Sequence, residues 1–169
     1  EKLEQLKNNP YGLWKTWIIN NKLTLRKVRK NDVDGKIIVN MRNENNKYFF
    51  NKNKFNWNNF KEIFYQKYFS NEIPPFFVCL NDTVIGFIGC KTIEKNINDI
   101  GIMFFKKYQN QGLGKKSLQK FLEICNKNHI IIAKILKDNI ASYKIFLKNG
   151  FVLNKDKTTD ELYYLTYKV

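Results

Sequence analysis

The amino-acid sequence predicts an α/β fold. Short apolar segments with the character of strands alternate with segments whose apolar residues recur at helical spacing. In the middle of the chain, the apolar segment Ile100–Phe105 leads through a turn with two glycines, Gln109–Gly114, into a helical pattern over Ser117–Cys125. A hydrophobic content of 43 %, with fourteen Phe, nine Tyr and three Trp, supplies one buried core for 169 residues and argues against disorder.

The first half of the predicted domain begins with a strand and two helices. Leu23–Val28 alternates as a strand does, and Asp32 is placed to cap a helix over Val33–Met41. Asn51–Asn59 is rich in Asn and Lys and is expected to be a loop, before a second helix that Ile73–Pro75 stops. The residues that this second helix is expected to bring to the core are Phe60, Ile63, Phe64 and Tyr68.

The second half is predicted to hold the remaining strands and two further helices. Asn81-Asp82 predicts the turn of a hairpin between Phe76–Leu80 and Thr83–Ile93, and Asn98-Asp99 is expected to precede the strand that ends at Phe105. The elements after the helical pattern of 117–125 are a strand over 130–136, a helix over 142–148 that ends at Gly150, and strands over 151–153 and 162–167. No internal repeat is present, so one domain is expected.

The turn Gln109–Gly114 predicts an anion-binding site. Its glycines allow a close approach of the backbone, and the helix that follows presents free N–H groups and the positive end of its dipole. The glycine spacing differs from the dinucleotide-binding and P-loop fingerprints, so neither of those sites is predicted.

A second block, Asp138–Phe151, follows about 25 residues later. Together, Gln109-x-x-Gly112-x-Gly114, Asn139 and the closing Asn149-Gly150-Phe151 resemble the GNAT superfamily of acyl-CoA-dependent N-acetyltransferases. The resemblance covers residues 22–169. It implies a mixed six- to seven-stranded sheet flanked by helices, with two central strands splayed apart to receive the acyl-pantetheine arm.

The resemblance also implies which residues bind acetyl-CoA, the expected co-substrate. The turn and the helix start would hold the pyrophosphate through main-chain N–H groups, and a backbone N–H of Met103–Phe105 would stabilise the oxyanion when an amine attacks the thioester. The expected cofactor-binding residues are Met103, Phe104, Phe105, Gln109, Gln111, Gly112, Leu113, Gly114, Lys115, Asn139 and Phe146.

The proton-transfer residues are less closely defined by the resemblance. Asp99 stands where family members often carry the general base, although a solvated turn residue is an equal reading, and Glu94 is a second candidate. Many members have a Tyr that protonates the leaving thiolate where this chain has Phe146, which cannot donate a proton. Tyr143, Ser142 or water would take that role. His129 is expected to cap a helix C-terminus instead of taking part in the reaction.

The acceptor amine is expected to be bound by the segment after the first helix. Arg42 suits a diphosphate, and Arg42, Asn43, the aromatic cluster Tyr48–Phe50 and Trp57 resemble the arrangement in family members that acetylate nucleotide-linked amino-deoxysugars, and in ribosomal-protein acetyltransferases. A nucleotide-linked amino sugar is therefore the first reading. A protein amine or another small amine is an alternative, and Phe146 keeps open a non-catalytic acyl-CoA-binding module.

The composition narrows the class of partner. The net charge is +15, but the lysines are spread over the whole chain and only three arginines occur, so a nucleic-acid surface is not expected. Lysines flank the two anion-facing helix starts, where they favour coenzyme A. No apolar run is long enough to cross a membrane, and a single His leaves no metal-binding spacing. The lysines concerned are Lys115, Lys116, Lys144 and Lys148.

Residues 1–21 are expected to be a linker or tail from a longer chain. Asn8–Gly12 breaks any early helix, and the sequence does not begin with Met. The expected protein partners are accordingly a fused N-terminal domain or a second copy of the chain. The three cysteines are an odd number in apolar surroundings, and the given sequence shows no signal-peptide pattern, so a reducing, cytoplasmic location is expected.

Overall fold

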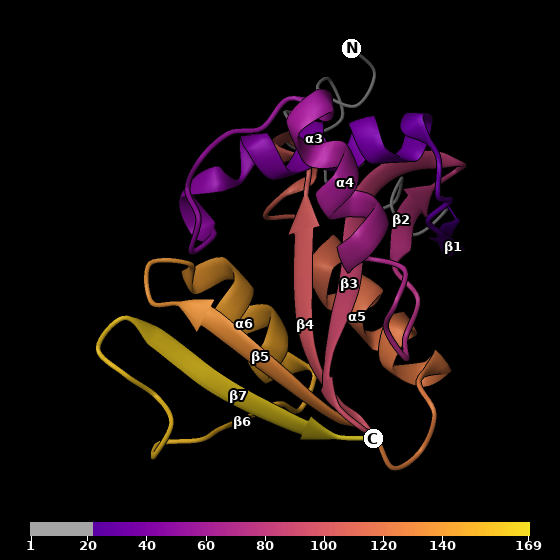
Figure 1. Ribbon diagram of the computed structural model, residues 1–169. Helices are drawn as coiled ribbons and strands as arrows, with labels where there is room; N and C mark the ends of the chain where they lie inside the picture. The colour runs from indigo at the N-terminus through magenta and orange to yellow at the C-terminus, as the bar shows by residue number, and fades with distance from the viewer. Residues whose placement is uncertain (1–21) are drawn as a thin grey trace, which may run out of the picture.

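The computed structural model describes residues 22–169, which form a seven-stranded sheet with the strand order β1-β2-β3-β4-β5-β7-β6 (Figure 1). The predicted linker, residues 1–21, lies outside the described residues. The strands are β1 (Leu23–Lys27), β2 (Phe76–Leu80), β3 (Thr83–Glu94), β4 (Ile97–Phe104), β5 (Ile130–Leu136), β6 (Val152–Leu153) and β7 (Leu162–Lys168). The α-helices are α3 (Asp32–Glu44), α4 (Trp57–Lys67), α5 (Leu113–Ile124) and α6 (Ile140–Lys148). Two short 3-10 turns are η1 (Asn46–Tyr48) and η2 (Lys106–Tyr108).

The sheet opens at its centre. β4 and β5 are the parallel pair, and their pairing extends only over Ile97–Asp99 against Ile130–Ile132, while every other neighbouring pair of strands is antiparallel. Beyond Asp99 the two strands diverge like the sides of a wedge (Figure 1). The predicted mixed sheet with splayed central strands is thereby confirmed.

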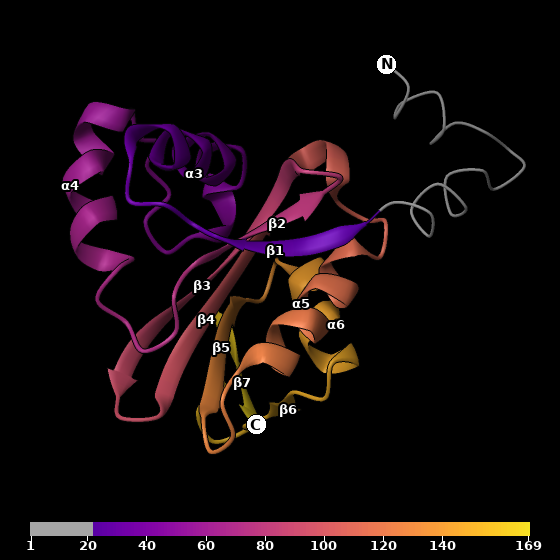
Figure 2. The same ribbon diagram turned by 90° about the vertical axis from the view of Figure 1, so that its right-hand side faces the viewer.

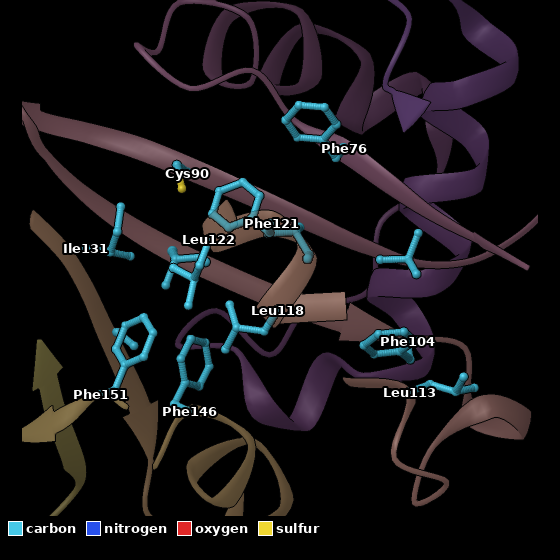
Figure 3. Packing of buried hydrophobic residues seen from close by; sticks show 14 of the residues in the cluster. Phe76, Cys90, Phe104, Leu113, Leu118, Phe121, Leu122, Ile131, Phe146 and Phe151 are labelled. Atoms are coloured by element: carbon cyan, nitrogen blue, oxygen red, sulfur yellow. The ribbon is translucent and has the colours of Figure 1, made fainter. Parts of the chain in front are cut away.

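Helices cover both faces of the sheet, α3 and α4 on one side and α5 and α6 on the other (Figure 2). Two hydrophobic clusters result, one on each face. Figure 3 shows the cluster under α5 and α6, in which Phe121 and Leu118 of α5 and Phe146 of α6 gather between the helices and the sheet. These three side chains are fully buried, so this apolar face fixes the two helices that carry the sequence motifs. No helix among residues 22–169 is long and apolar enough to cross a membrane.

The first helix has a different cap from the predicted one. Asn31 is the N-cap, because its side chain accepts a hydrogen bond from the N–H of Asp34, and Asp32 is the first helical residue. Asp32 instead accepts from the hydroxyl of Tyr65 on α4. Val33 points outward with 68 % of its surface exposed, so the buried stripe of α3 is narrower than the sequence pattern suggested.

The ends of α4 also differ from the prediction. Asn56 caps it and the helix begins at Trp57, inside the segment that was expected to be a loop. It ends at Lys67, well before Ile73–Pro75. At this end the side chains of Ser70 and Asn71 donate hydrogen bonds to the last helical carbonyls. Phe60 and Phe64 are buried as predicted and Tyr68 is partly buried, whereas Ile63 is 38 % exposed.

The hairpin turn Asn81-Asp82 is confirmed, with both residues in the left-handed region at φ 49° and 67°. The prediction for Asn98-Asp99 was wrong, because both residues lie inside β4. Asp99 pairs with Lys91 on β3 and with Ile132 on β5, so the strand is hydrogen-bonded on both sides at this point.

Candidate active site

A cavity of about 290 Å³ occupies the wedge between β4 and β5 and extends beneath the ends of α3 and α4. Its walls come from the middle of β3, from residues 99–103 of β4, from residues 134–136 of β5, from the start of α6 and from the aromatic segment Tyr48–Phe50. The parts of β4 and β5 that lie beyond their pairing thus line this cavity from opposite sides.

The floor of this cavity lacks side chains at its centre. Three cross-strand pairs of β3 and β4, at every second position of the register, share the sheet face toward α3 and α4. The middle pair is Gly89 with Gly101. A Cβ atom added to Gly101 would meet no other atom within 4 Å. The pair Gly89–Gly101, the glycine floor, therefore leaves open space for a ligand above Gly101, whereas the ring of Phe87 covers Gly89, where a Cβ atom would lie 2.6 Å from it. The pairs on either side are Phe87–Met103 and Lys91–Asp99.

Asp99 is the one carboxylate among the described residues that line the cavity. Its Oδ2 lies 3.7 Å from Nζ of Lys134. Burial raises the pKa of Asp99 above its ordinary value, although the nearby charges of Lys134, Lys91 and Lys67 oppose that effect. A carboxylate with a raised pKa in a cavity is suited to accept a proton from a bound amine.

The start of α5 fits an anionic group. Gly112 is the N-cap with φ 76°, a left-handed conformation that strongly favours glycine, and it has no side chain to cap the helix. The N–H groups of Leu113, Gly114 and Lys115 have no acceptor within the helix. No acidic residue lies in the first turn, and Lys115 is exposed there. Free donors, the helix dipole and nearby lysines match the pyrophosphate of coenzyme A.

Gly114 allows α5 to lie close to α6. A Cβ atom at this position would be 2.5 Å from Cδ1 of Ile145 on α6 and 3.6 Å from the ring of Phe104. The two motif glycines thus have different tasks, since Gly112 sets the turn and Gly114 permits close packing.

The two motif glutamines act through hydrogen bonds within the protein. Nε2 of Gln109 donates to Oδ1 of Asn45 and to the carbonyl of Phe104, and Nε2 of Gln111 donates to the carbonyl of Lys107. Their side chains therefore fix the course of the turn, and the donors left for a phosphate are the main-chain N–H groups and the lysines.

The start of α6 supplies part of the cavity wall. Asn139 is the N-cap and accepts from the N–H of Ser142, and both residues line the cavity together with the buried Phe146. Tyr143 lies elsewhere, because its ring stacks on Tyr163 of β7 with 3.9 Å between centroids, and it is not among the lining residues. Ser142 is thus better placed than Tyr143 to donate a proton.

The three residues predicted to bind the acceptor have internal partners. The guanidinium of Arg42 is buried, donates to the carbonyls of Asn51 and Asn53, and lies over the rings of Phe49 and Phe55. Burial lowers the pKa of Arg42, and the residue does not line the cavity. Arg42 therefore ties down the segment after η1 and has no free donor face for a diphosphate.

Asn43 and Trp57, like Arg42, hold neighbouring segments of the protein in place. The side chain of Asn43 both donates to the carbonyl of Phe55 and accepts from its N–H. Trp57 packs so closely on α3 that a Cβ atom at Gly35 would be 2.1 Å from its ring. The cavity wall contains other residues that the sequence analysis did not single out as acceptor-binding. These are Lys67, Tyr68, Gly89, Lys91, Gly101 and Lys134.

The remaining candidates lie outside the cavity lining. Glu94 is exposed at the end of β3. His129 does not cap a helix as predicted, because it is buried with its Nδ1 3.1 Å from Nδ2 of Asn98 and 3.9 Å from the carboxylate of Glu72. Within residues 22–169, no group of three His, Cys, Asp or Glu side chains could hold a metal ion, and the three cysteines there are free.

Comparison with solved structures identifies the fold. The structure of yncA from Salmonella typhimurium with acetyl-CoA has a TM-score of 0.65 at 16 % identity, covering 86 % of this chain and 93 % of that one. Spermidine N-acetyltransferase from Vibrio cholerae, in complex with CoA and spermine, has 0.73 at 18 %, covering 86 % and 95 %. Campylobacter jejuni N-acetyltransferase PseH has 0.62 at 18 %, covering 86 % and 97 %.

No curated protein sequence is similar enough to count as a relative. The profile of the acetyltransferase (GNAT) domain matches residues 22–152, which is most of the chain and includes both the glycine turn and the start of α6. The chain therefore belongs to the GNAT family and is an N-acetyltransferase that uses acetyl-CoA as its acetyl donor.

Proposed function

We propose that the acceptor is the amino group of a nucleotide-linked amino-deoxysugar, which attacks the acetyl group directly in a ternary complex. The observation that carries this proposal is the open space at Gly101, on the floor of a cavity that the aromatic segment Tyr48–Phe50 also lines. Open space in a cavity lined by aromatic rings suits a sugar or a base, because both present faces that stack on aromatic side chains.

Different residues have different roles in the proposed reaction. Acetyl-CoA supplies a thioester carbon that an uncharged amine can attack. The N–H groups at the start of α5 hold the pyrophosphate, and Asp99 accepts the proton that the amine must lose. Ser142, or water, returns a proton to the leaving thiolate. The protein otherwise acts by aligning the two substrates.

Two features weigh against other classes of acceptor. A concave cavity suits a small molecule better than a protein segment, which would need an open groove. A polyamine would bring positive charge to a cavity that already contains Lys67, Lys91 and Lys134. The free cysteines support the proposal that the protein works in the reducing cytoplasm.

A screen of acceptors tests the proposal. Thiol release from acetyl-CoA is measured with UDP- and dTDP-linked amino sugars, basic peptides and polyamines at equal concentrations. The proposal expects the nucleotide-linked sugars to have the highest kcat/KM. If peptides or polyamines are acetylated faster, the sugar assignment is wrong and the faster class replaces it. If none of these amines is acetylated although acetyl-CoA binds, the acceptor belongs to another class of amine.

A further inference from the structure

Three lysine side chains surround the single carboxylate of the cavity. Lys91 is the direct cross-strand partner of Asp99, Lys134 reaches it from β5, and Lys67 comes from the last turn of α4. Together the three ammonium groups and Asp99 give the described cavity wall an excess of positive charge.

Only one of these lysines forms an ion pair with Asp99. Lys134 pairs with Asp99, whereas no hydrogen bond or ion pair joins Nζ of Lys67 or Lys91 to another side chain of residues 22–169. Partial burial, followed by the charges of Lys91 and Arg42, lowers the pKa of Lys67. The three lysines are exposed at the cavity wall, so a bound anion can reach their ammonium groups and is attracted by them.

Coenzyme A does not account for this second cluster of charge. Its pyrophosphate is assigned to the start of α5, which covers the sheet face opposite to the one under α4 (Figure 2). Lys67 and Lys91 lie on the α4 side, next to the glycine floor. The two clusters of positive charge therefore lie on opposite sides of the sheet.

We propose that Lys67 and Lys91 form an anion subsite that binds the phosphate groups of the acceptor, while its amine-bearing ring lies over Gly101. This inference rests on the proposed function and names the residues that would select its substrate. An acceptor held in this way presents its amine beside Asp99, because Asp99 and Lys91 are adjacent on the floor.

The first experiment measures binding of UDP by calorimetry with the coenzyme A site saturated by CoA. Lys67→Met and Lys91→Met keep the apolar stems and remove only the charges, and each should weaken UDP binding roughly tenfold. Lys120→Met is the matched control, since Lys120 is exposed on α5, and it should leave the affinity unchanged. If UDP binds and its affinity is equal in all four proteins, the subsite is wrong.

The second experiment separates the subsite from the identity of the acceptor. kcat/KM is measured for a nucleotide-linked amino sugar, the same amino sugar as its 1-phosphate, and the free amino sugar. The subsite predicts that both phosphorylated forms are preferred, and that the Lys67→Met, Lys91→Met double variant loses this preference. If the nucleotide-linked form is not acetylated but the 1-phosphate is still preferred, the nucleotide sugar proposal fails and the subsite stands. If the double variant lowers all three rates equally, the subsite is wrong.

Gly101→Val tests the position of the ring. The added Cβ atom meets open space, so the fold should persist, and CoA affinity is measured alongside turnover. Turnover of every acceptor should fall at least tenfold, because the floor is then occupied. Undiminished turnover in a folded Gly101→Val protein would mean that the acceptor lies elsewhere.

Discussion

The side-chain amide of Gln109 donates a hydrogen bond to Oδ1 of Asn45, 2.8 Å away. Both side chains also donate to the carbonyl of Phe104, each at 2.9 Å. The end of α3, the end of β4 and the turn into α5 are thereby joined at one point. This junction connects the α3 side of the sheet to the α5 side.

Replacing Gln109 should affect both stability and the use of acetyl-CoA. Gln109→Ala removes two donors from a partly buried junction, which should cost about 1–2 kcal/mol of unfolding free energy. The turn should also lose its fixed position, so KM for acetyl-CoA should rise. Urea denaturation and steady-state kinetics measure the two effects. Gln119→Ala, on the exposed surface of α5, is the control and should change neither.

Gly114→Val should weaken CoA binding by separating α5 from α6. The new side chain would collide with Ile145, so the start of α5 must move away from its position in the site. We expect at least a tenfold loss of CoA affinity by calorimetry, with circular dichroism confirming the fold. Ile145→Ala in the same protein should restore part of the affinity, because it vacates the space. A double variant as weak as Gly114→Val alone would count against the packing role.

Arg42 should act on stability and not on recognition of phosphate. Arg42→Met leaves the carbonyls of Asn51 and Asn53 without their charged donor, at a cost of about 2–3 kcal/mol. Arg42→Lys should recover little, because a single ammonium cannot reproduce the planar fork. KM should rise equally for phosphorylated and free amino sugars. A selective loss of the phosphorylated substrates would show instead that Arg42 contacts the anion.

The elements that depend on neighbouring residues could be predicted from the sequence. The strand, glycine turn and α5 follow from local hydrophobic periodicity and from the conformations that glycine allows, and Asn81-Asp82 defines its hairpin in the same way. The cap of α3 was misplaced by one residue because Asn31 and Asp32 are both good capping residues. Only the position of their side chains in the structure separates them.

The residues that depend on distant partners could not be predicted. Arg42 was expected to be free to bind a diphosphate, because the hydrophobic periodicity of the sequence does not predict that segment 51–55 runs around its guanidinium. The glycine floor depends on the register that pairs Gly89 with Gly101, and Lys67 enters the cavity only because α4 ends above it. Asp99 was expected in a turn because Asn-Asp is typical of turns, but strand pairing on both sides overrides that preference.

Asp34 should make stability depend on pH in the acid range. Its carboxylate is buried, yet hydrogen bonds from the side chain of Arg26 and the N–H of Arg29 hold its pKa below the ordinary 3.8, outweighing the effect of burial. The stabilisation is therefore complete above the pKa of the unfolded chain and is lost as the pH falls through the lower folded pKa.

Asp34→Asn tests this dependence. At pH 7 the variant should be less stable than the native protein by about 2–3 kcal/mol, because charged hydrogen bonds are lost. The difference in unfolding free energy should remain constant down to about pH 4 and shrink below it. Urea denaturation at a series of pH values measures it. A difference that does not change between pH 7 and pH 3 would mean that the charge of Asp34 contributes nothing.

The last prediction concerns proton transfer by Asp99. If its carboxylate accepts the proton of the amine, Asp99→Asn should lower kcat/KM by roughly 10²–10⁴-fold below the pKa of the amine. The loss should become smaller above that pKa, because an amine that is already neutral needs no base. The alternative is that Asp99 only balances the charge of Lys134, 3.7 Å away. Combining Asp99→Asn with Lys134→Met distinguishes the two, since the double variant restores the charge balance without restoring a base. Recovery of activity in the double variant would therefore show a purely electrostatic role, whereas a persistent loss that shrinks at high pH identifies Asp99 as the proton acceptor.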